Sequence, residues 1–184
     1  MIDTLTWAWY HTALILGMFT IVVWTYRTLC VIGRNFGFGT ELTLERYGKD
    51  SWAVVTGATD GIGKAAAMHI AKEGFNVVLI SRTLSKLETV AKEVEEHAKK
   101  NGKTIQTKVV QLDFTKNFDA PTFAKLYEQN LKDIDVSVLV NNVGMAGDPG
   151  IPLHETSDQD VHNMMSCNMY GNVLLTREVI QGFK

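Results

Sequence analysis

The hydrophobic pattern from residue 51 onward alternates between continuous apolar runs and segments in which apolar residues recur at helical spacing. The continuous runs, typical of parallel strands buried on both faces, are Trp52–Val55, Val77–Ile80, Ile105–Leu112 and Val136–Val140. The segments with helical spacing are Lys64–Lys72, Leu84–Lys100 and Pro121–Leu131. Strands that alternate with helices of this length predict right-handed βαβ units. The expected fold class is therefore α/β, a partial Rossmann fold with a doubly wound parallel sheet of about four strands.

An amide interrupts the apolar stripe of the last predicted helix. This helix opens at Ser157, which resembles a capping box with Asp160, and it runs to about Gly182. The stripe consists of Val161, Met164, Met165 and Asn168. Burying an amide without partners costs about 1–3 kcal/mol, so we expect the Asn168 side chain to be satisfied by backbone, by water or by a reacting group.

The N-terminus has a different pattern, a long stretch without charge. From Thr4 to Tyr26 there is no Asp, Glu, Lys or Arg, and the stretch exceeds the roughly 20 residues that a helix needs to cross a bilayer. Aromatic residues of the kind found at head groups mark its two ends, namely Trp7, Trp9 and Tyr10, and Trp24 and Tyr26. The stretch predicts a membrane anchor within residues 1–35. A cleavable signal peptide is the alternative, but a basic n-region and a small-residue cleavage site are lacking; a buried core helix is less favoured.

Basic residues on only one side of this stretch predict its orientation. Arg27, Arg34, Arg46 and Lys49 follow it, and no Lys or Arg precedes it, so the rest of the chain is expected in the cytosol. The glycine-rich segment Gly33–Gly39 is interpreted as a juxtamembrane linker. The predicted organisation is an anchor at residues 1–35, a linker at residues 36–50 and an incomplete Rossmann domain at residues 51–184.

Composition excludes several other functions. The 184 residues have a formal net charge of -2, which gives no electrostatic reason to expect a nucleic acid partner. Cys30 and Cys167 are far apart and lack CxxC or Cys/His spacing, so neither a disulfide framework nor a metal site is predicted. His154 and His162 also lack metal-ligand spacing.

A glycine-rich turn follows the first predicted strand and opens the first predicted helix of the Rossmann part. In Thr56–Gly63, Gly57 is free to adopt a backbone angle closed to other residues. Gly61 and Gly63 allow close approach of phosphates and of the sheet. The turn brings backbone N–H groups and the positive end of a helix dipole to one point, which suits a dinucleotide pyrophosphate. Glycine triplets also occur in ordinary turns, but the strand before and the helix after favour binding.

Two motifs give the chain a specific resemblance. Thr56-Gly57-x-x-x-Gly61-x-Gly63 resembles the TGxxxGxG cofactor loop of the short-chain dehydrogenase/reductase family, and Asn141-Asn142-Val143-Gly144 resembles its NNAG motif. The longer strings TGATDGIGKA, VVLISRTLSKLE and LVNNVGM behind a membrane helix look like the membrane-bound branch with 17β-hydroxysteroid dehydrogenases and very-long-chain 3-ketoacyl-CoA reductases. The resemblance covers Tyr47 to Lys184, while the anchor matches in kind only.

The resemblance implies a cofactor and the residues that hold it. The implied cofactor contacts in the loop are Gly57, Thr59, Gly61, Ile62 and Gly63. Ser81 and Arg82 follow the second strand, where a cation suits the 2′-phosphate of NADPH, so NADPH/NADP is the expected cofactor. A solvated surface arginine is the alternative for Arg82, and the acidic Asp60 weakens the NADPH preference. Asp113 is expected at the adenine edge, or as an ordinary loop-capping aspartate.

Three further residues receive roles from the same resemblance. Asn141 is expected to tie the central strands together, and Gly144 to give the cofactor close backbone access. Asn168 matches the family asparagine that holds a water in the proton relay, so it is the one candidate catalytic residue. A structural asparagine remains the alternative for Asn168.

The family's remaining catalytic residues do not occur in this sequence. The chemistry requires a Ser that hydrogen-bonds the substrate carbonyl and a Tyr-x-x-x-Lys pair, in which Lys lowers the Tyr pKa. None of the five tyrosines has Lys four positions later. We therefore expect the chain to be the N-terminal portion of a longer enzyme, in which the fourth strand is an open edge, the last helix exposes apolar side chains, and stability is marginal.

Two functions follow from these observations. The first is a membrane-anchored, NADPH-dependent oxidoreductase of the endoplasmic reticulum that reduces the keto group of a hydrophobic substrate, a 3-ketoacyl-CoA or a 17-ketosteroid. The alternative is a non-catalytic, membrane-anchored protein that binds NADP or pairs with a full-length relative. Residues 4–26 are the expected contact with the membrane, and a homo-oligomer stays open.

Overall fold

The computed structural model describes residues 3–36, 44–116 and 119–182. The chain divides into two compact units, Met1–Glu41 and Leu42–Lys184. Each unit is described by itself below.

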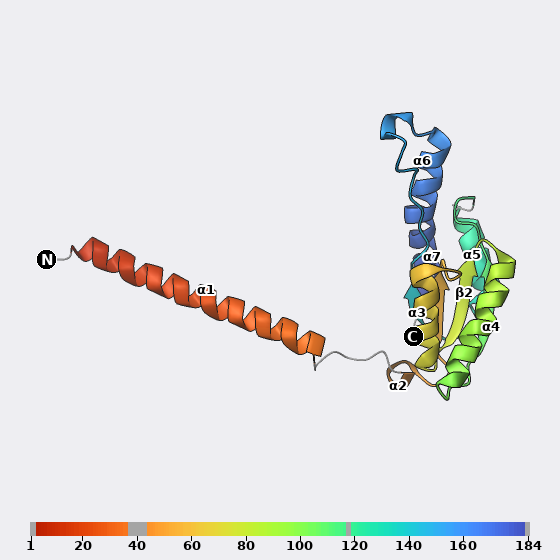
Figure 1. Cartoon of the computed structure of the whole chain (residues 1–184), viewed down its shortest axis with the longest axis horizontal. Helices are drawn as coiled ribbons and strands as arrows, with labels where there is room; N and C mark the ends of the chain where they lie inside the picture. The colour runs from red at the N-terminus through yellow and green to blue at the C-terminus, as the bar shows by residue number, and fades with distance from the viewer. Residues whose placement is uncertain (1–2, 37–43, 117–118, 183–184) are drawn as a thin grey trace. The chain divides into compact units, whose positions relative to one another are not determined.

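The first unit is a single helix, α1, at Thr4–Phe36 (Figure 1). It contains a span that is long and apolar enough to cross a membrane, Thr6–Phe36. The helix predicted for Thr4–Tyr26 is thus present, but it continues through Gly33 into the segment predicted as a linker. An isolated glycine costs a helix only about 1 kcal/mol, which is too little to end a long apolar helix. Residues 37–43 of the predicted linker lie outside the described residues.

The second unit is built on a four-stranded sheet in the order β3-β2-β1-β4. The strands are β1 Trp52–Thr56, β2 Asn76–Ser81, β3 Thr107–Gln111 and β4 Val136–Val140. All neighbouring strands are parallel, with Val55 opposite both Leu79 and Val140. The predicted parallel α/β sheet is confirmed, and β4 forms one edge of it, as expected.

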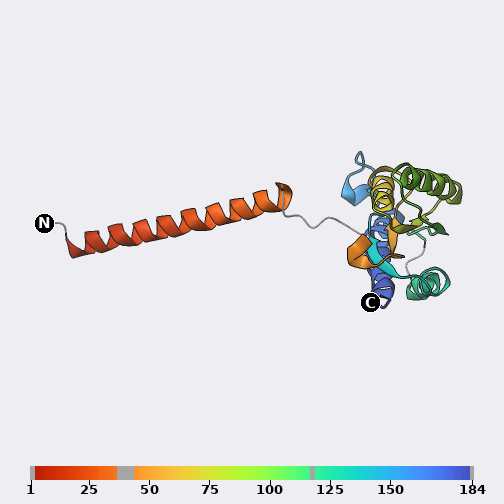
Figure 2. The same cartoon turned by 90° about the horizontal axis from the view of Figure 1, so that it is seen from below.

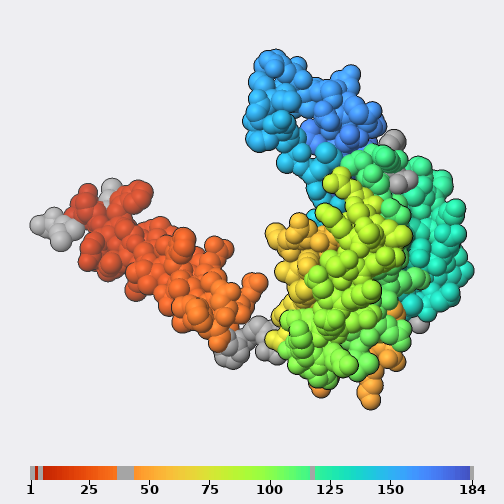
Figure 3. All heavy atoms as spheres, turned by 45° about the vertical axis from the view of Figure 1, so that its right-hand side comes forward, coloured from red at the N-terminus to blue at the C-terminus, as the bar shows by residue number. Residues whose placement is uncertain are grey.

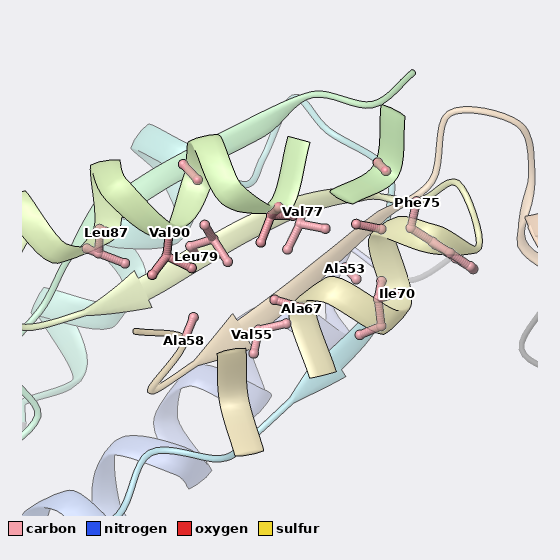
Figure 4. Packing of buried hydrophobic residues seen from close by; sticks show 14 residues of the cluster. Ala53, Val55, Ala58, Ala67, Ile70, Phe75, Val77, Leu79, Leu87 and Val90 are labelled. Carbon is pink, nitrogen blue, oxygen red and sulfur yellow. The ribbon is translucent and has the colours of Figure 1, made fainter. Parts of the chain in front are cut away.

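Helices cover both faces of this sheet (Figure 2). The first face carries α3 Gly61–Lys72 and α4 Leu84–Lys100, and the second carries α5 Ala120–Asn130 and α7 Gly171–Ile180. Because successive side chains of a strand point to opposite faces, Val55 packs under α3 and α4 while Val54 packs under α5 and α7. Figure 4 shows the first of these two clusters, and the side chains of α3 and α4 form a continuous surface above it (Figure 3).

A short helix precedes the sheet. Helix α2, Leu44–Tyr47, lies in the segment predicted as linker, yet Leu44 and Tyr47 pack against the core under α3 and α4. The Tyr47 ring meets the Phe75 ring edge-on at a centroid distance of 5.6 Å. We therefore assign α2 to the second unit.

The last predicted helix is present but contains an irregular turn. After a 3₁₀ turn at Leu153–Glu155, α6 spans Asp158–Met165, a π-helical turn spans Ser166–Tyr170, and α7 completes the helix. Ser157 caps this helix as predicted, because its hydroxyl accepts from the Asp160 amide at 3.1 Å, and the Asp160 carboxylate in turn accepts from the same hydroxyl at 2.6 Å. The helix also exposes apolar side chains, as expected, at Val161, Met165, Met169, Tyr170, Val173 and Ile180.

Candidate functional site

A pocket of about 260 Å³ lies where the carboxyl ends of the parallel strands meet. In doubly wound sheets this edge is where ligands bind. The segments that follow all four strands contribute to its lining, together with one residue of the π-helical turn. The lining residues are Gly57, Ser81, Arg82, Leu112, Asp113, Phe114, Thr115, Asn142, Val143, Gly144, Met145 and Cys167.

The glycine turn after β1 is crowded at Gly57 and Gly63 and open at Gly61. Gly57 has φ +63°, and a Cβ there would lie 2.8 Å from Asn142 Nδ2. A Cβ on Gly63 would lie 2.3 Å from the Gly57 carbonyl oxygen. Gly61, with φ +51°, has nothing within 4 Å of such a Cβ, so its outer side is open. The turn is therefore packed tightly against β4 on one side and is accessible to a ligand on the other.

Asn142 ties the turn to the end of β4. Its side-chain amide donates to the Thr56 carbonyl at 3.1 Å and to the Gly57 carbonyl at 3.3 Å. The Asn141 amide instead donates to the Thr176 hydroxyl of α7 at 2.8 Å, and Asn141 does not line the pocket. The strand-tying bonds expected from Asn141 thus come from its neighbour.

The alternation of side chains along β4 explains this difference. Val138 and Val140 face the α3 and α4 side of the sheet, and Leu139 faces the α5 and α7 side. Asn142 continues the first series and reaches the glycine turn, whereas Asn141 continues the second and reaches α7. The period of two in the sequence could have distinguished the two asparagines.

Ser81, the last residue of β2, and Arg82, which follows it, form the wall beside the glycine turn. The buried Ser81 and the exposed Arg82 both line the pocket. The Ser81 hydroxyl lies 3.1 Å from the Thr59 hydroxyl, so Thr59 contacts the pocket wall although it is not part of the lining. The backbone of Arg82 is held by Gln111, whose Nε2 donates to the Arg82 carbonyl at 2.9 Å.

Asp113 follows β3 and is negatively charged at neutral pH. Burial is the largest single influence and raises its pKa, whereas hydrogen bonds from the Thr115 hydroxyl at 2.7 Å and amide at 3.1 Å lower it. The charges of Lys116 and Arg82 act in the same direction, so the pKa of Asp113 lies below its usual value. Asp113 therefore caps its own loop and also faces the pocket.

Asn168 fixes the loop after β4. Its Oδ1 accepts from the Met145 amide at 2.8 Å, and its Nδ2 donates to the Met145 carbonyl at 2.8 Å. The expectation that the amide would be satisfied is confirmed, with backbone as the partner. The expectation of a buried position is wrong, because Asn168 is exposed in the π-helical turn.

The structure brings some predicted residues together and leaves others outside the pocket. Gly57, Ser81, Arg82, Asp113 and Gly144 line it. Outside it lie Thr59, Gly61, Ile62, Gly63, Asn141 and Asn168. Of these, Gly61, Ile62 and Gly63 form the first turn of α3, where the Ile62 side chain is 80% exposed.

Sequence reasoning missed seven residues of the lining, which are Leu112, Phe114, Thr115, Asn142, Val143, Met145 and Cys167. Phe114 is buried, and its ring centroid lies 5.8 Å from that of Phe123. Burial and the charge of Asp113 raise the pKa of the Cys167 thiol, so it stays protonated at neutral pH. Neither Phe114 nor Cys167 belongs to a sequence motif, and Cys167 lies outside the predicted apolar stripe of the last helix, so the sequence gave no signal of a ligand at either residue.

Comparison with known proteins was decisive for the family. The model of the short chain dehydrogenase family matches residues 51–184, which is more than half of the chain. The chain belongs to the short-chain dehydrogenase family. The family match therefore agrees with the resemblance drawn from the glycine turn and the Asn141–Gly144 motif.

Relatives within this short-chain dehydrogenase family share a name. The chain is 41% identical over 162 residues to a very-long-chain 3-oxoacyl-CoA reductase of Aspergillus terreus, covering 83% of this chain and 44% of that one. It is 40% identical over 163 residues to a protein of the same name from Schizosaccharomyces pombe, covering 89% and 46%. The chain thus spans less than half the length of these curated relatives.

A solved structure is similar in fold. The L-sorbose reductase of Gluconobacter frateurii, determined with NADPH and L-sorbose, is 26% identical, with a TM-score of 0.59. The match covers 74% of this chain and 49% of that one.

Proposed function

We propose that the protein is a membrane-anchored, NADP-dependent short-chain dehydrogenase acting on the keto group of a very-long-chain 3-oxoacyl-CoA. One observation carries the cofactor assignment: Gly57, Arg82, Asp113 and Gly144, from the ends of four strands, line a single pocket. The substrate class rests on the relatives, which are named very-long-chain 3-oxoacyl-CoA reductases. A 17-ketosteroid is a less supported substrate, because neither of these relatives is named for it.

The residues present fit a nicotinamide dinucleotide. The positive end of the α3 dipole lies beside a glycine turn that is open at Gly61, while Asp60 accepts from the Gly61 amide. Asp113 supplies a negatively charged acceptor at the end of β3, and Gly144 leaves the backbone after β4 open to a close ligand. The bound cofactor would supply hydride chemistry, and these residues would bind and orient it.

Arg82 supports a cofactor with a 2′-phosphate. A guanidinium at the end of the second strand is placed to pair with a phosphate on the adenosine ribose, where NAD-specific proteins use a carboxylate. Ser81 adds a hydroxyl beside it, which the Thr59 hydroxyl contacts. We infer that Arg82 provides most of the selectivity for NADPH, together with contacts from Ser81.

The N-terminal helix and the arginines after it bear on where the chain is located and how it is divided. We propose that α1 anchors the chain in the endoplasmic reticulum membrane, with the second unit in the cytosol. Tryptophan and tyrosine near both ends of its charge-free stretch, and arginines after it, support this orientation. We propose that the chain consists of an anchor at residues 1–35 and an NADP-binding unit that includes α2.

Replacement of Arg82 tests the cofactor proposal. Arg82→Gln removes a charge-assisted bond of about 1.5–3 kcal/mol, so NADPH affinity should fall by about tenfold to a hundredfold, and NADH affinity should fall much less. Fluorescence titration of the full chain in detergent measures both. Arg46→Gln is the control, because Arg46 is an exposed arginine in α2, which precedes the amino end of β1 and not the carboxyl ends that form the pocket. Equal losses for both nucleotides would contradict a role of Arg82 at the 2′-phosphate.

A second candidate function is a non-catalytic NADP-binding protein. It is favoured by the absence from this sequence of a Tyr followed by Lys at the fourth position. Steady NADPH-dependent reduction of a ketone by the purified chain would exclude this candidate. Cofactor binding without turnover would support it.

A further inference from the structure

One polar side chain of α7 lies directly behind the pocket wall. The side-chain amide of Asn172 donates to the carbonyl of Asn168 at 3.2 Å. It also reaches the carbonyls of Val143 and Cys167, each at 3.5 Å, which is long for a hydrogen bond. Val143 and Cys167 line the pocket, whereas Asn172 does not. The amide therefore bridges the segment after β4 and the π-helical turn from outside the pocket.

This amide is the middle member of a row of polar side chains along the last helix. Four residues before it, the Asn168 side chain bonds the backbone of Met145. Four residues after it, the Thr176 hydroxyl accepts from the side chain of Asn141. Four residues of a helix rise by about 6 Å, and two residues of an extended chain rise by nearly the same length. The row therefore joins the helix to every second residue after β4, with Val143 opposite the middle member.

The oxygen of the Asn172 side chain has no donor. Asn172 Oδ1 is buried, and among the residues that the structure describes none donates a hydrogen bond to it. A buried acceptor without a donor is destabilising, and asparagine is a poorer helix former than leucine. Leucine has a similar branched shape and would avoid both penalties. A residue that is locally unfavourable beside a pocket is typical of residues that serve the site.

We propose that Asn172 is a positioning residue of the nucleotide site, which holds the wall formed by Val143 and Cys167 in the arrangement that a dinucleotide needs. This inference rests on the proposed function, since it concerns the same pocket. Asn172 acts through the two carbonyls and does not touch the ligand. The wall that it holds follows β4, whereas Arg82 follows β2, so its effect does not depend on a phosphate on the adenosine ribose.

Asn172→Leu separates this role from a contribution to stability. The substitution removes both the donor and the unpartnered oxygen while it keeps the branched shape. Because the unpartnered oxygen is lost with the donor, the unfolding temperature should rise or stay within about 2 °C of the original value.

Asn130→Leu in α5 is the matched control. Asn130 is also partly buried, and its side-chain amide also donates to the carbonyl four residues earlier, that of Leu126 at 3.1 Å. It does not line the pocket, and its amide reaches no residue that does. The same chemical change is thus made in a helix away from the proposed site.

The measurement is titration of the full chain in detergent with NADPH and with NADH, together with thermal unfolding of each variant. Asn172→Leu should weaken binding of both nucleotides by about threefold to tenfold, the range that corresponds to one hydrogen bond. The loss should be equal for NADPH and NADH, unlike the loss in Arg82→Gln. Asn130→Leu should leave both affinities unchanged.

Four results would overturn the inference. They are unchanged affinities in Asn172→Leu, a loss confined to NADPH, an equal loss in Asn130→Leu, and a loss accompanied by a fall in unfolding temperature, which would make the role of Asn172 structural only. Each of these leaves the proposed cofactor site standing as long as the unmodified chain binds NADPH and responds to Arg82→Gln. An unmodified chain that binds neither nucleotide overturns both the inference and the proposed function.

Discussion

Gly63 lies where the glycine turn, the start of α3 and Asn142 meet, and the space beside its α-carbon is filled. A Cβ there would lie 2.3 Å from the Gly57 carbonyl oxygen and 2.5 Å from Asn142 Nδ2. Backbone cannot move aside as a flexible side chain does, so Gly63→Ala should lower the free energy of unfolding by about 3 kcal/mol. Urea denaturation measures this value.

Gly147 provides the control for that substitution. A Cβ on Gly147 would meet only the Met164 side chain, its sulfur at 3.4 Å and its Cε at 3.6 Å, which are ordinary contacts with a flexible side chain. Gly147→Ala should therefore change stability by less than about 0.5 kcal/mol. Equal losses of unfolding free energy in Gly63→Ala and Gly147→Ala would show that the tight packing around Gly63 does not determine the loss of stability.

At the same scale, motif spacing predicted much of the pocket. Ser81 ends a strand, and Gly57, Arg82, Asp113 and Gly144 each follow one. Parallel strands bring their carboxyl ends to one edge, so the proximity of these residues follows from the sequence. The contact of Cys167 with the pocket does not follow, because it depends on how the last helix packs across the sheet. The exposure of Asn168 depends on the same tertiary arrangement.

Helix α7 has one buried side and one exposed side. Leu175 is fully buried under the sheet, and Val173 is 66% exposed. Leu175→Ala should lower the free energy of unfolding by about 3 kcal/mol, since it removes buried methyl groups and leaves a cavity. Val173→Ala should change it by less than about 0.5 kcal/mol. Urea denaturation of the two variants side by side tests whether α7 is docked in solution, and similar values would contradict its packing.

Most elements could be predicted because each carries its own periodic pattern. The four strands and the helices α3, α4 and α5 lie within a few residues of the predicted ranges. The π-helical turn could not be predicted in this way, because it coincides with bonds from Asn168 to Met145, 23 residues earlier. Helix α1 extends to Phe36, beyond the predicted end at Tyr26, since Gly33 is a weak helix breaker in an apolar setting.

At the scale of the whole molecule, the proposed anchor makes a direct prediction about membrane retention. The full chain should stay in the membrane pellet after alkaline carbonate extraction. Leu16→Arg combined with Ile21→Arg places two charges near the centre of α1, at about 2.5–3.5 kcal/mol each, and should release the chain into the supernatant.

The matched control places the same charges near the end of α1. Val31→Arg combined with Ile32→Arg adds two arginines close to Arg34, where long side chains reach the head groups. This variant should stay in the pellet. Release of the unmodified chain would contradict the anchor without affecting the cofactor site, which belongs to the other unit.

The hydroxyl of Thr56 has a consequence for the glycine motif that begins with it. It accepts from the amides of Asn142 and Val143, each at 3.0 Å, and donates to the Val140 carbonyl at 3.3 Å. A hydroxyl has one proton and two lone pairs, so its bonding capacity is used up inside the protein. Thr56, the first residue of the motif, therefore joins β1 to the end of β4. Its hydroxyl has no hydrogen-bonding capacity left for a nucleotide.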